Sequence, residues 1–430
     1  MAATRSSGHR GGGRPGAPCA QAALAMPRQP SIAPLRLDAL PHGARSALVL
    51  VAVAIVAFNL RTPTASLPPL LADVQRGLGL SGPAMGSLTA LPVLCMALCA
   101  PPAQRLAHLV GREATTLWGI GLVAAGTLLR LGGDATVVLF GGTLVAGVGI
   151  AVCGVTLPSI IKDRFPDRPG VATAAYTVPM MLGAAVAPTL AVPLLHTLGG
   201  WEASLASWAV PALLAAALWA PLARRSSRRR PAVRTAAGRL PWRSRSAWLL
   251  AGFLSVQSVL AYAYLAWLAP AYESRGWSAA TTGALLGVLH LAQLVTALAL
   301  PALADLSRDR RPALVAAVTC TALGAGVLFA APDAAPWAAT IVLGLGLGGG
   351  FSLALVLLAD FAASPAAAGR LAAMTFLVCY STAAVAPVLV GALRDATGAY
   401  AAPFGLLAVL ACGELAIATR LRPALRASVR

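Results

Sequence analysis

The chain has 430 residues, of which 58% are hydrophobic and only 11% charged, and its formal net charge is +19. Soluble globular proteins carry about 25% charged residues, so this composition excludes most soluble classes and requires a lipid solvent. The large positive charge, taken alone, is also typical of nucleic-acid-binding proteins. The positions of the basic residues decide between these two interpretations.

The apolar residues fall into twelve runs, each close to the ~20 residues that a helix needs to cross a ~30 Å hydrocarbon core. The runs cover residues 46–68, 82–104, 114–131, 135–160, 170–194, 201–223, 246–270, 279–303, 312–331, 336–360, 366–391 and 399–420. Their length and the lack of alternating polarity favour helices over barrel strands. The sequence therefore predicts an all-α polytopic membrane protein with twelve transmembrane helices.

The basic residues lie almost entirely on one side of these spans. Segments on the side of the N-terminus hold 28 of the 33 Lys and Arg residues, the opposite side holds 4, and Arg61 lies inside the first span. Basic residues concentrate in cytoplasmic loops, so we expect both termini and the central loop to be cytoplasmic and the protein to lie in the inner membrane. The loop arginines then fix topology and contact anionic lipid, and nucleic acid is excluded as a partner.

The seven cysteines are not arranged for cross-links or metal binding. Six lie in predicted spans, and Cys19 lies in the N-terminal tail. Because no cysteine falls in an outer loop, we expect no disulfides. Cys95 and Cys99 are one helical turn apart without His or carboxylate partners, so we expect neither a metal site nor a cofactor.

An internal repeat relates the two halves of the chain. Three blocks recur in the same order: Thr143, Val145, Gly147 and Gly149 as Thr340, Val342, Gly344 and Gly346 at an offset of 197; Leu106–Arg112 as Leu303–Asp309 at 197; and Ala184–Pro188 as Ala383–Pro387 at 199. Twelve spans thus divide into six plus six, and both halves enter the membrane in the same sense. This is the parallel two-bundle plan of the major facilitator superfamily, in which the site lies between the halves.

The repeat also predicts domain boundaries. We expect a disordered tail over 1–45, a six-helix bundle over 46–223, a basic linker over 224–245, a second six-helix bundle over 246–420 and a tail over 421–430. Pro188 and Pro387 fall at matching positions of helices 5 and 11, where a weakened turn allows gating helices to bend. Packing alone explains the same prolines equally well.

Several motifs resemble one branch of that superfamily. They are GVGIAV, LPSIIKDRFPDRPGVATAAYTVPM and AVPLL between Gly147 and Trp219, NLR at Asn59–Arg61, LPPLLADV from Leu67, LTALPVL in helix 2, Gln257-Ser258 and ATGAY ending at Tyr400. Together they resemble the CynX/NimT family of cyanate and nitroimidazole transporters, which implies small anions such as cyanate as one cargo class. The family favours Asn where this chain has Gly154, Arg where it has Glu202, and Pro directly after the helix 1 Arg, where Thr62 stands. Whether these departures change specificity stays open.

Polar groups inside the spans are candidates for solute binding, because they are expensive in lipid. Arg61 is the strongest candidate. Counted from Ser46, it lies ~22 Å along a helix that crosses a ~30 Å hydrocarbon core, and no acid occupies a similar depth in helix 1. An unpaired guanidinium facing a water-filled cleft would bind an anion with fixed geometry. The alternative is a structural clamp on backbone carbonyls.

Further candidates could supply donors and stacking faces around the solute. They are Tyr176, Gln257, Tyr262, His290, Gln293 and Tyr380. Tyr262 and Tyr264 are two residues apart on a helix, so they cannot both face the cleft. His290 could relay a proton or make a helix-to-helix hydrogen bond. Proton coupling through the anion itself, and an uncoupled facilitator, stay open as well.

Two acids lie near the cytoplasmic ends of their spans. We expect Asp360 and Glu414 to pair with Arg370 or Arg420, so neither is counted as a central carboxylate.

Two matching loops resemble the superfamily's cytoplasmic loop motif, in which an acid caps neighbouring helices. The first copy holds His108 and Arg112, and His108 stands in the place of the acid. The second copy keeps the acid as Asp305. We therefore expect Asp305, Arg308 and Arg310 to hold the neighbouring helices together more strongly than the first copy does.

These features predict a transporter of a small anionic or small heteroaromatic solute, working as a monomer by alternating access between two bundles. A multidrug or antibiotic exporter on the same fold is the alternative, and it would need no arginine inside the membrane. No His-Glu metal spacing, nucleophile elbow or phosphate loop occurs, so we expect no enzyme activity.

Overall fold

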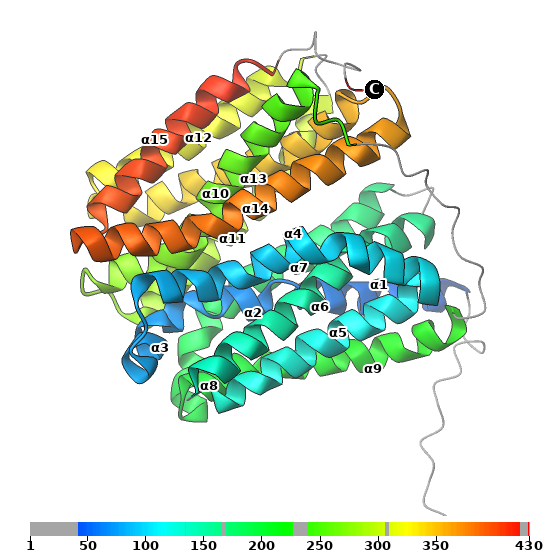
Figure 1. The fold of residues 1–430 in the computed structure, drawn as a ribbon, viewed down its shortest axis with the longest axis horizontal. Helices are drawn as coiled ribbons and strands as arrows, with labels where there is room; N and C mark the ends of the chain where they lie inside the picture. The colour runs from blue at the N-terminus through cyan, green and yellow to red at the C-terminus, as the bar shows by residue number, and fades with distance from the viewer. Residues whose placement is uncertain are drawn as a thin grey trace, which may run out of the picture. The chain divides into compact units, whose positions relative to one another are not determined.

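The computed structural model describes residues 42–133, 135–164, 169–226, 240–305, 309–421 and 429. In this part of the chain, 12 segments are long and apolar enough to cross a membrane, and they coincide with the predicted spans. The all-α transmembrane architecture is thereby confirmed (Figure 1). Nearly all of the predicted N-terminal tail and most of the basic linker lie outside the described residues, and the domain boundaries stay a prediction.

The first six spans form one bundle around buried side chains such as Val53, Ile120, Cys153 and Trp219. Its long helices are α1 (His42–Phe58), α4 (Gly82–Val110), α5 (Arg112–Leu129), α6 (Thr136–Arg164), α7 (Pro169–Leu198) and α9 (Ala209–Ser226). Short elements connect them: α2 (Thr62–Ala65), η2 (Pro68–Leu70), α3 (Leu71–Leu78), η3 (Arg130–Gly132) and α8 (Trp201–Ser207).

The last six spans form the second bundle, with buried Phe253, Leu254, Leu314 and Leu358 in its core. Its helices are α10 (Arg245–Glu273), α11 (Ala279–Asp305), α12 (Arg311–Ala330), α13 (Pro336–Asp360), α14 (Pro365–Thr397) and α15 (Ala401–Ala418). Figure 1 shows these helices, coloured green to red, grouped apart from the blue to green helices of the first bundle.

The first span is broken, whereas the sequence predicted a continuous helix over 46–68. Helix α1 ends at Phe58, and a turn over residues 59–61 leads into the short α2. The Asn59 side chain donates to the Ile55 carbonyl oxygen at 2.7 Å, and Pro63 has no N–H to continue the helical ladder. Arg61 occupies the N-cap position of α2 and so lies at the discontinuity itself.

The internal repeat is visible as a duplicated ion pair near the helix ends on the side of the termini. Arg112 pairs with Asp163 in the first bundle, and Arg310 pairs with Asp360 at 2.9 Å in the second. The two aspartates are separated by 197 residues, which is the offset found in the sequence. The expectation that Asp360 pairs with Arg370 or Arg420 was wrong, because the equivalent of the Arg112–Asp163 pair holds it.

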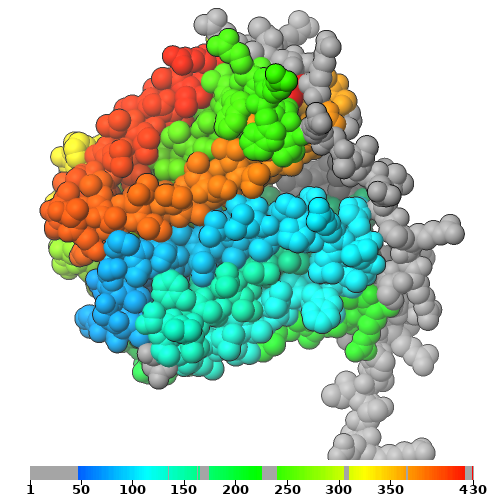
Figure 2. Space-filling view, viewed as in Figure 1, coloured from blue at the N-terminus to red at the C-terminus, as the bar shows by residue number. Residues whose placement is uncertain are grey.

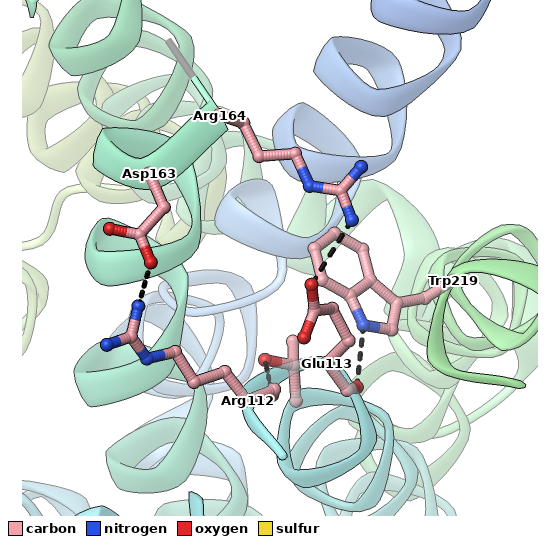
Figure 3. A network of polar contacts seen from close by, with 6 residues as sticks. Arg112, Glu113, Asp163, Arg164 and Trp219 are labelled. Atoms are coloured by element: carbon pink, nitrogen blue, oxygen red, sulfur yellow. Dashed lines mark hydrogen bonds and ion pairs between the residues drawn. The ribbon is translucent and has the colours of Figure 1, made fainter. Parts of the chain in front are cut away.

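Further polar contacts extend this cluster in the first bundle (Figure 3). Arg164 pairs with the Glu113 carboxylate at 3.1 Å, and the indole Nε1 of the buried Trp219 donates to the Glu113 backbone oxygen at 2.9 Å. The cluster therefore ties α5, α6 and α9 together at one end.

The two bundles touch where a glycine of one helix meets a proline carbonyl of another. A Cβ built on Gly86 of α4 would lie 2.2 Å from the Pro387 oxygen of α14, and one on Gly283 of α11 would lie 2.3 Å from the Pro188 oxygen of α7. Gly86 and Gly283 are again 197 residues apart. We call these contacts the α4–α14 seam and the α7–α11 seam.

Both seams lie on the side of the membrane opposite the termini. In the α4–α14 seam the Gly82 N–H donates to Asp395 Oδ2 at 2.7 Å, and farther along α4 Val93 packs with Ala383 and Ala384. Figure 2 shows the orange surface of α14 directly against the blue and cyan surface of α4. The seams thus join the halves of these helices that are remote from the termini.

Candidate solute-binding site

Arg61 connects the two bundles at the break in the first span. Its guanidinium donates from Nη1 to the Tyr262 hydroxyl oxygen of α10 at 3.1 Å, and its Cζ lies 5.7 Å from the centre of the Tyr262 ring. No carboxylate in the described part of the chain forms an ion pair with it. Its partners among the described residues are therefore neutral groups, and the guanidinium can bind an anionic or electron-rich solute.

Aromatic and imidazole side chains from three more helices surround this guanidinium. Tyr176 of α7, Tyr380 of α14 and His290 of α11 each interact with it electrostatically. Arg61, Tyr176 and Tyr380 are half-buried, so each keeps some accessible surface, and the Tyr380 ring stacks on Phe376. The structure thus brings together five of the seven predicted solute-binding residues, from both bundles.

The prediction that Tyr262 and Tyr264 face different ways is confirmed. Tyr262 points to Arg61, whereas Tyr264 packs edge-on against Phe404 with ring centres 5.5 Å apart, inside the second bundle. Two neighbouring aromatic residues therefore serve different partners.

His290 uses one ring nitrogen within its own helix. Its Nδ1 lies 2.8 Å from the Leu286 carbonyl oxygen, which can only accept, so Nδ1 carries the proton and Nε2 is the acceptor of the neutral ring. The buried side chain thus offers a single further nitrogen, close to Arg61.

The two glutamines are not placed at Arg61 by any polar contact. Gln257 Nε2 donates to the Leu347 carbonyl oxygen at 2.7 Å and so fastens α10 to α13 within the second bundle. Gln293 is half-buried on α11, one turn beyond His290. A role for either in solute binding stays a prediction.

Arg130 is a buried group that the sequence analysis missed, because it was counted among the outer loop residues. The structure places it 1% exposed at the end of α5, where Nη1 donates to the Pro63 carbonyl oxygen at 2.7 Å. Helix α2 ends too soon to satisfy that carbonyl itself. The prolines at 63, 68 and 69 were the signal that backbone oxygens near Arg61 would need outside donors.

The residues predicted to act in gating occupy two regions. Pro188 and Pro387 present their carbonyls at the seams, while Arg112 and Arg310 form the duplicated ion pairs. His108 is exposed near the end of α4. Arg308 and the side chain of Asp305 lie outside the part of the structure that can be described. Roles in conformational change stay predictions.

Known proteins resemble this chain over most of its length. The model of the Major Facilitator Superfamily matches residues 49–387. An uncharacterized transporter of Bacillus subtilis (strain 168) is 34% identical over 373 residues, 85% of this chain and 92% of that protein. The 2-nitroimidazole transporter of Escherichia coli (strain K12) is 33% identical over 85% of this chain and 93% of its own length.

Two further comparisons agree. The cyanate transport protein CynX of Escherichia coli (strain K12) is 31% identical, covering 87% of this chain and 97% of that protein. A solved D-xylose-proton symporter superimposes with a TM-score of 0.70 at 14% identity, over 87% of this chain and 97% of the other, which shows a shared fold. The chain is therefore a multi-pass transporter of small solutes and belongs to the Major Facilitator Superfamily.

Proposed function

We propose that the chain carries a small anionic or small heteroaromatic solute, with Arg61 as the group that binds its negative or electron-rich end. The observation that carries this proposal is a guanidinium inside the membrane whose contacts are a tyrosine hydroxyl and neutral rings, with no carboxylate of the described residues paired to it. Two relatives are named for transport of 2-nitroimidazole and cyanate, which are solutes of this size and chemistry. The alternative, an exporter of larger drugs, would not require an arginine inside the membrane.

The transport cycle follows from the same geometry. Tyr176 and Arg61 belong to the first bundle, and Tyr262, His290 and Tyr380 belong to the second. A solute bound among them touches both bundles, so its binding is coupled to their relative position. We propose alternating access, in which the two seams close the side opposite the termini and separate when that side opens.

The charge distribution supports an orientation as well. We propose an inner-membrane protein with both termini in the cytoplasm, because 28 of 33 basic residues lie on their side, where they also contact anionic lipid. We propose that one chain is the transporting unit, since both halves of the site come from it.

The test is solute counterflow in proteoliposomes with labelled cyanate and labelled 2-nitroimidazole. Arg61→Ala removes the fork of donors, and hydrogen bonds to charged groups contribute about 1.5–3 kcal/mol, so the kcat/KM for cyanate is expected to fall about 10- to 150-fold. Arg61→Lys keeps the charge without the planar fork, so its kcat/KM for cyanate is expected to lie between those of the wild type and Arg61→Ala.

Arg275→Ala is the matched control, because Arg275 is an exposed arginine whose partner is Asp333 at 2.7 Å. It should leave counterflow within twofold of the wild type. Cyanate transport by Arg61→Ala at the wild-type rate would refute the role of Arg61. If the wild type exchanges neither cyanate nor 2-nitroimidazole, the proposed solute class is refuted.

A further inference from the structure

One buried face of α15 contains a single ionisable residue. The buried residues of this helix are Pro403, Phe404, Leu407, Ala411, Glu414 and Ala418. Their spacing of three and four residues after Phe404 places them on one side of the helix. Glu414 is fully buried and takes a position where every other member of this face is apolar.

Among the described residues, neither carboxylate oxygen of Glu414 has a hydrogen-bond partner, and no ion pair includes this side chain. We expected from the sequence that Glu414 pairs with Arg370 or Arg420, and this expectation was wrong. The burial of this side chain is therefore not compensated by a polar contact in the state described.

The register of the neighbouring helices shows what lies at the depth of Glu414. Phe404 meets Tyr264 of α10, and Gly405 meets Phe329 of α12, and both helices run antiparallel to α15. Counting along each helix puts Glu414 level with Leu254 and Cys320. At that depth α10 and α12 thus carry an aliphatic residue and a thiol, each followed in sequence by a buried hydroxyl residue, Ser255 or Thr321.

Titratable and charged groups on the helices packed against α15, and just beyond its own end, lie at or near that depth. They are Arg245 and Tyr264 on α10, Cys320 and Arg311 on α12, Arg370, Cys379 and Tyr380 on α14, and Arg420 after α15. Arg245 and Arg311 are nine residues from the level of Glu414, which is about 13 Å at 1.5 Å per residue, and Arg420 follows Glu414 by six residues. In the described part of the chain none of these arginines forms an ion pair with Glu414.

An ionised carboxylate without a partner is strongly unfavourable in such a place, so the side chain is held as the neutral acid. A neutral acid without a hydrogen bond still packs less favourably than the apolar residues around it. The position is best explained by the one property that Leu or Ala lacks, which is the ability to bind and release a proton. Glu414 is one turn from the end of α15, about 6 Å along the axis, so a small repacking there would admit water.

We propose that Glu414 is a proton-binding site of the second bundle and that its proton is the ion coupled to solute transport. The inference rests on the proposed function, since it names the coupling ion of that cycle. In one state the buried carboxyl holds the proton, and in the other the carboxylate meets water and gives it up. His290 suits this task less, because a second positive charge there would be repelled by Arg61.

The first experiment separates exchange from proton-driven accumulation in proteoliposomes with labelled cyanate and 2-nitroimidazole. Glu414→Gln keeps the shape of the neutral acid but cannot release a proton. It is expected to retain counterflow within about twofold, while accumulation driven by a pH gradient falls at least tenfold. Glu414→Asp should keep part of that accumulation, and Glu202→Gln, a half-buried glutamate of α8, should keep all of it.

The proposal would be overturned if Glu414→Gln accumulated solute at the wild-type level. It would also be overturned if the pH gradient had no effect on accumulation by the wild type. A wild type without counterflow for either probe would refute the proposed function instead. The second experiment needs no solute: infrared spectroscopy of the membrane-embedded protein at neutral pH detects the C=O stretch of a protonated carboxylic acid. The wild type is expected to show a band that Glu414→Gln lacks, and identical spectra would overturn the proposal.

Discussion

The α4–α14 seam and the α7–α11 seam are built alike in their packing and differently in their polar chemistry. In both, a glycine lies so close to a proline carbonyl that an added Cβ would fall 2.2–2.3 Å from the oxygen. The two seams differ in which group accepts a hydrogen bond from the first N–H groups of the glycine-bearing helix, α4 or α11. This difference shows that duplicated halves can keep equivalent packing while their helix caps diverge.

Helix α4 receives its cap from the other bundle. Its own N-cap residue, Ser81, makes no capping bond, and the Gly82 N–H is bound by Asp395 of α14. Helix α11 is capped locally instead: Ser278 Oγ accepts from the Thr281 N–H at 3.2 Å. Separating the α4–α14 seam therefore exposes an uncapped helix end and a carboxylate, whereas the α7–α11 seam separates without losing a cap.

The largest expected effect comes from substituting the glycine that packs against a proline carbonyl in each seam. Gly86→Ala and Gly283→Ala each force a methyl group against a backbone oxygen, and overpacking of this kind costs about 1–3 kcal/mol. Each variant should therefore lower the ratio of closed to open seam about 5- to 150-fold. Spin labels on Arg76→Cys and Arg275→Cys, in a background without native cysteines, measure the separation of the bundles on that side.

Gly121→Ala and Gly326→Ala are the matched controls for these two variants. Both glycines lie in membrane helices, and a Cβ on either would meet no atom within 4 Å. The controls should leave the label distances unchanged. Unchanged distances in Gly86→Ala as well would show that the seam does not depend on this contact.

A smaller effect is expected where the seams differ. Asp395→Asn keeps an acceptor for the Gly82 N–H but removes the charge, which is worth about 1 kcal/mol at a helix N-terminus, so the closed ratio should fall roughly fivefold. The same label pair measures it. Asp333→Asn should have no effect, because Asp333 is exposed and its partner Arg275 is already replaced in the labelled protein. An equal effect from Asp395→Asn and Asp333→Asn would contradict the cap interpretation.

The smallest effect on the bundles is expected from the local cap. Ser278→Ala removes a capping bond worth about 1 kcal/mol, so the melting temperature should fall. Because the bond lies within one bundle, the label distances should change by less than those of Asp395→Asn. If Ser278→Ala increased the label distance more than Asp395→Asn does, the conclusion that only the α4–α14 seam depends on its helix cap would be contradicted.

Sequence patterns were sufficient for the architecture because lipid imposes one strong requirement on every span. The apolar runs and the repeat predicted twelve helices in two halves, and the structure has both. The break at residues 59–61 was missed because a hydropathy window averages over a local turn. The partner of Asp360 was missed because Arg310 approaches from another helix, and sequence distance favours Arg370.

For the site, residue type and depth were enough to find Arg61 and the side chains near it. Tyr176, Tyr262 and Tyr380 were chosen as polar groups in spans, and they meet because those spans converge. Gln257 fits the same criterion but binds the Leu347 carbonyl, which only the packing of α10 on α13 decides. Arg130 lies at a helix end, where sequence alone does not distinguish a loop arginine from a buried one.

The bond from Arg130 to the Pro63 carbonyl makes the position of Arg61 depend on a helix that carries no solute-binding candidate. Arg61 stands on a short turn rather than on a long rigid helix, and Arg130 of η3, directly after α5, binds the backbone two residues away. A tilt of α5 would therefore strain or break the bond that holds the backbone next to Arg61. The residues around the tether, such as Trp201 against Gly133, thus belong to the mechanics of the site although they lie outside it.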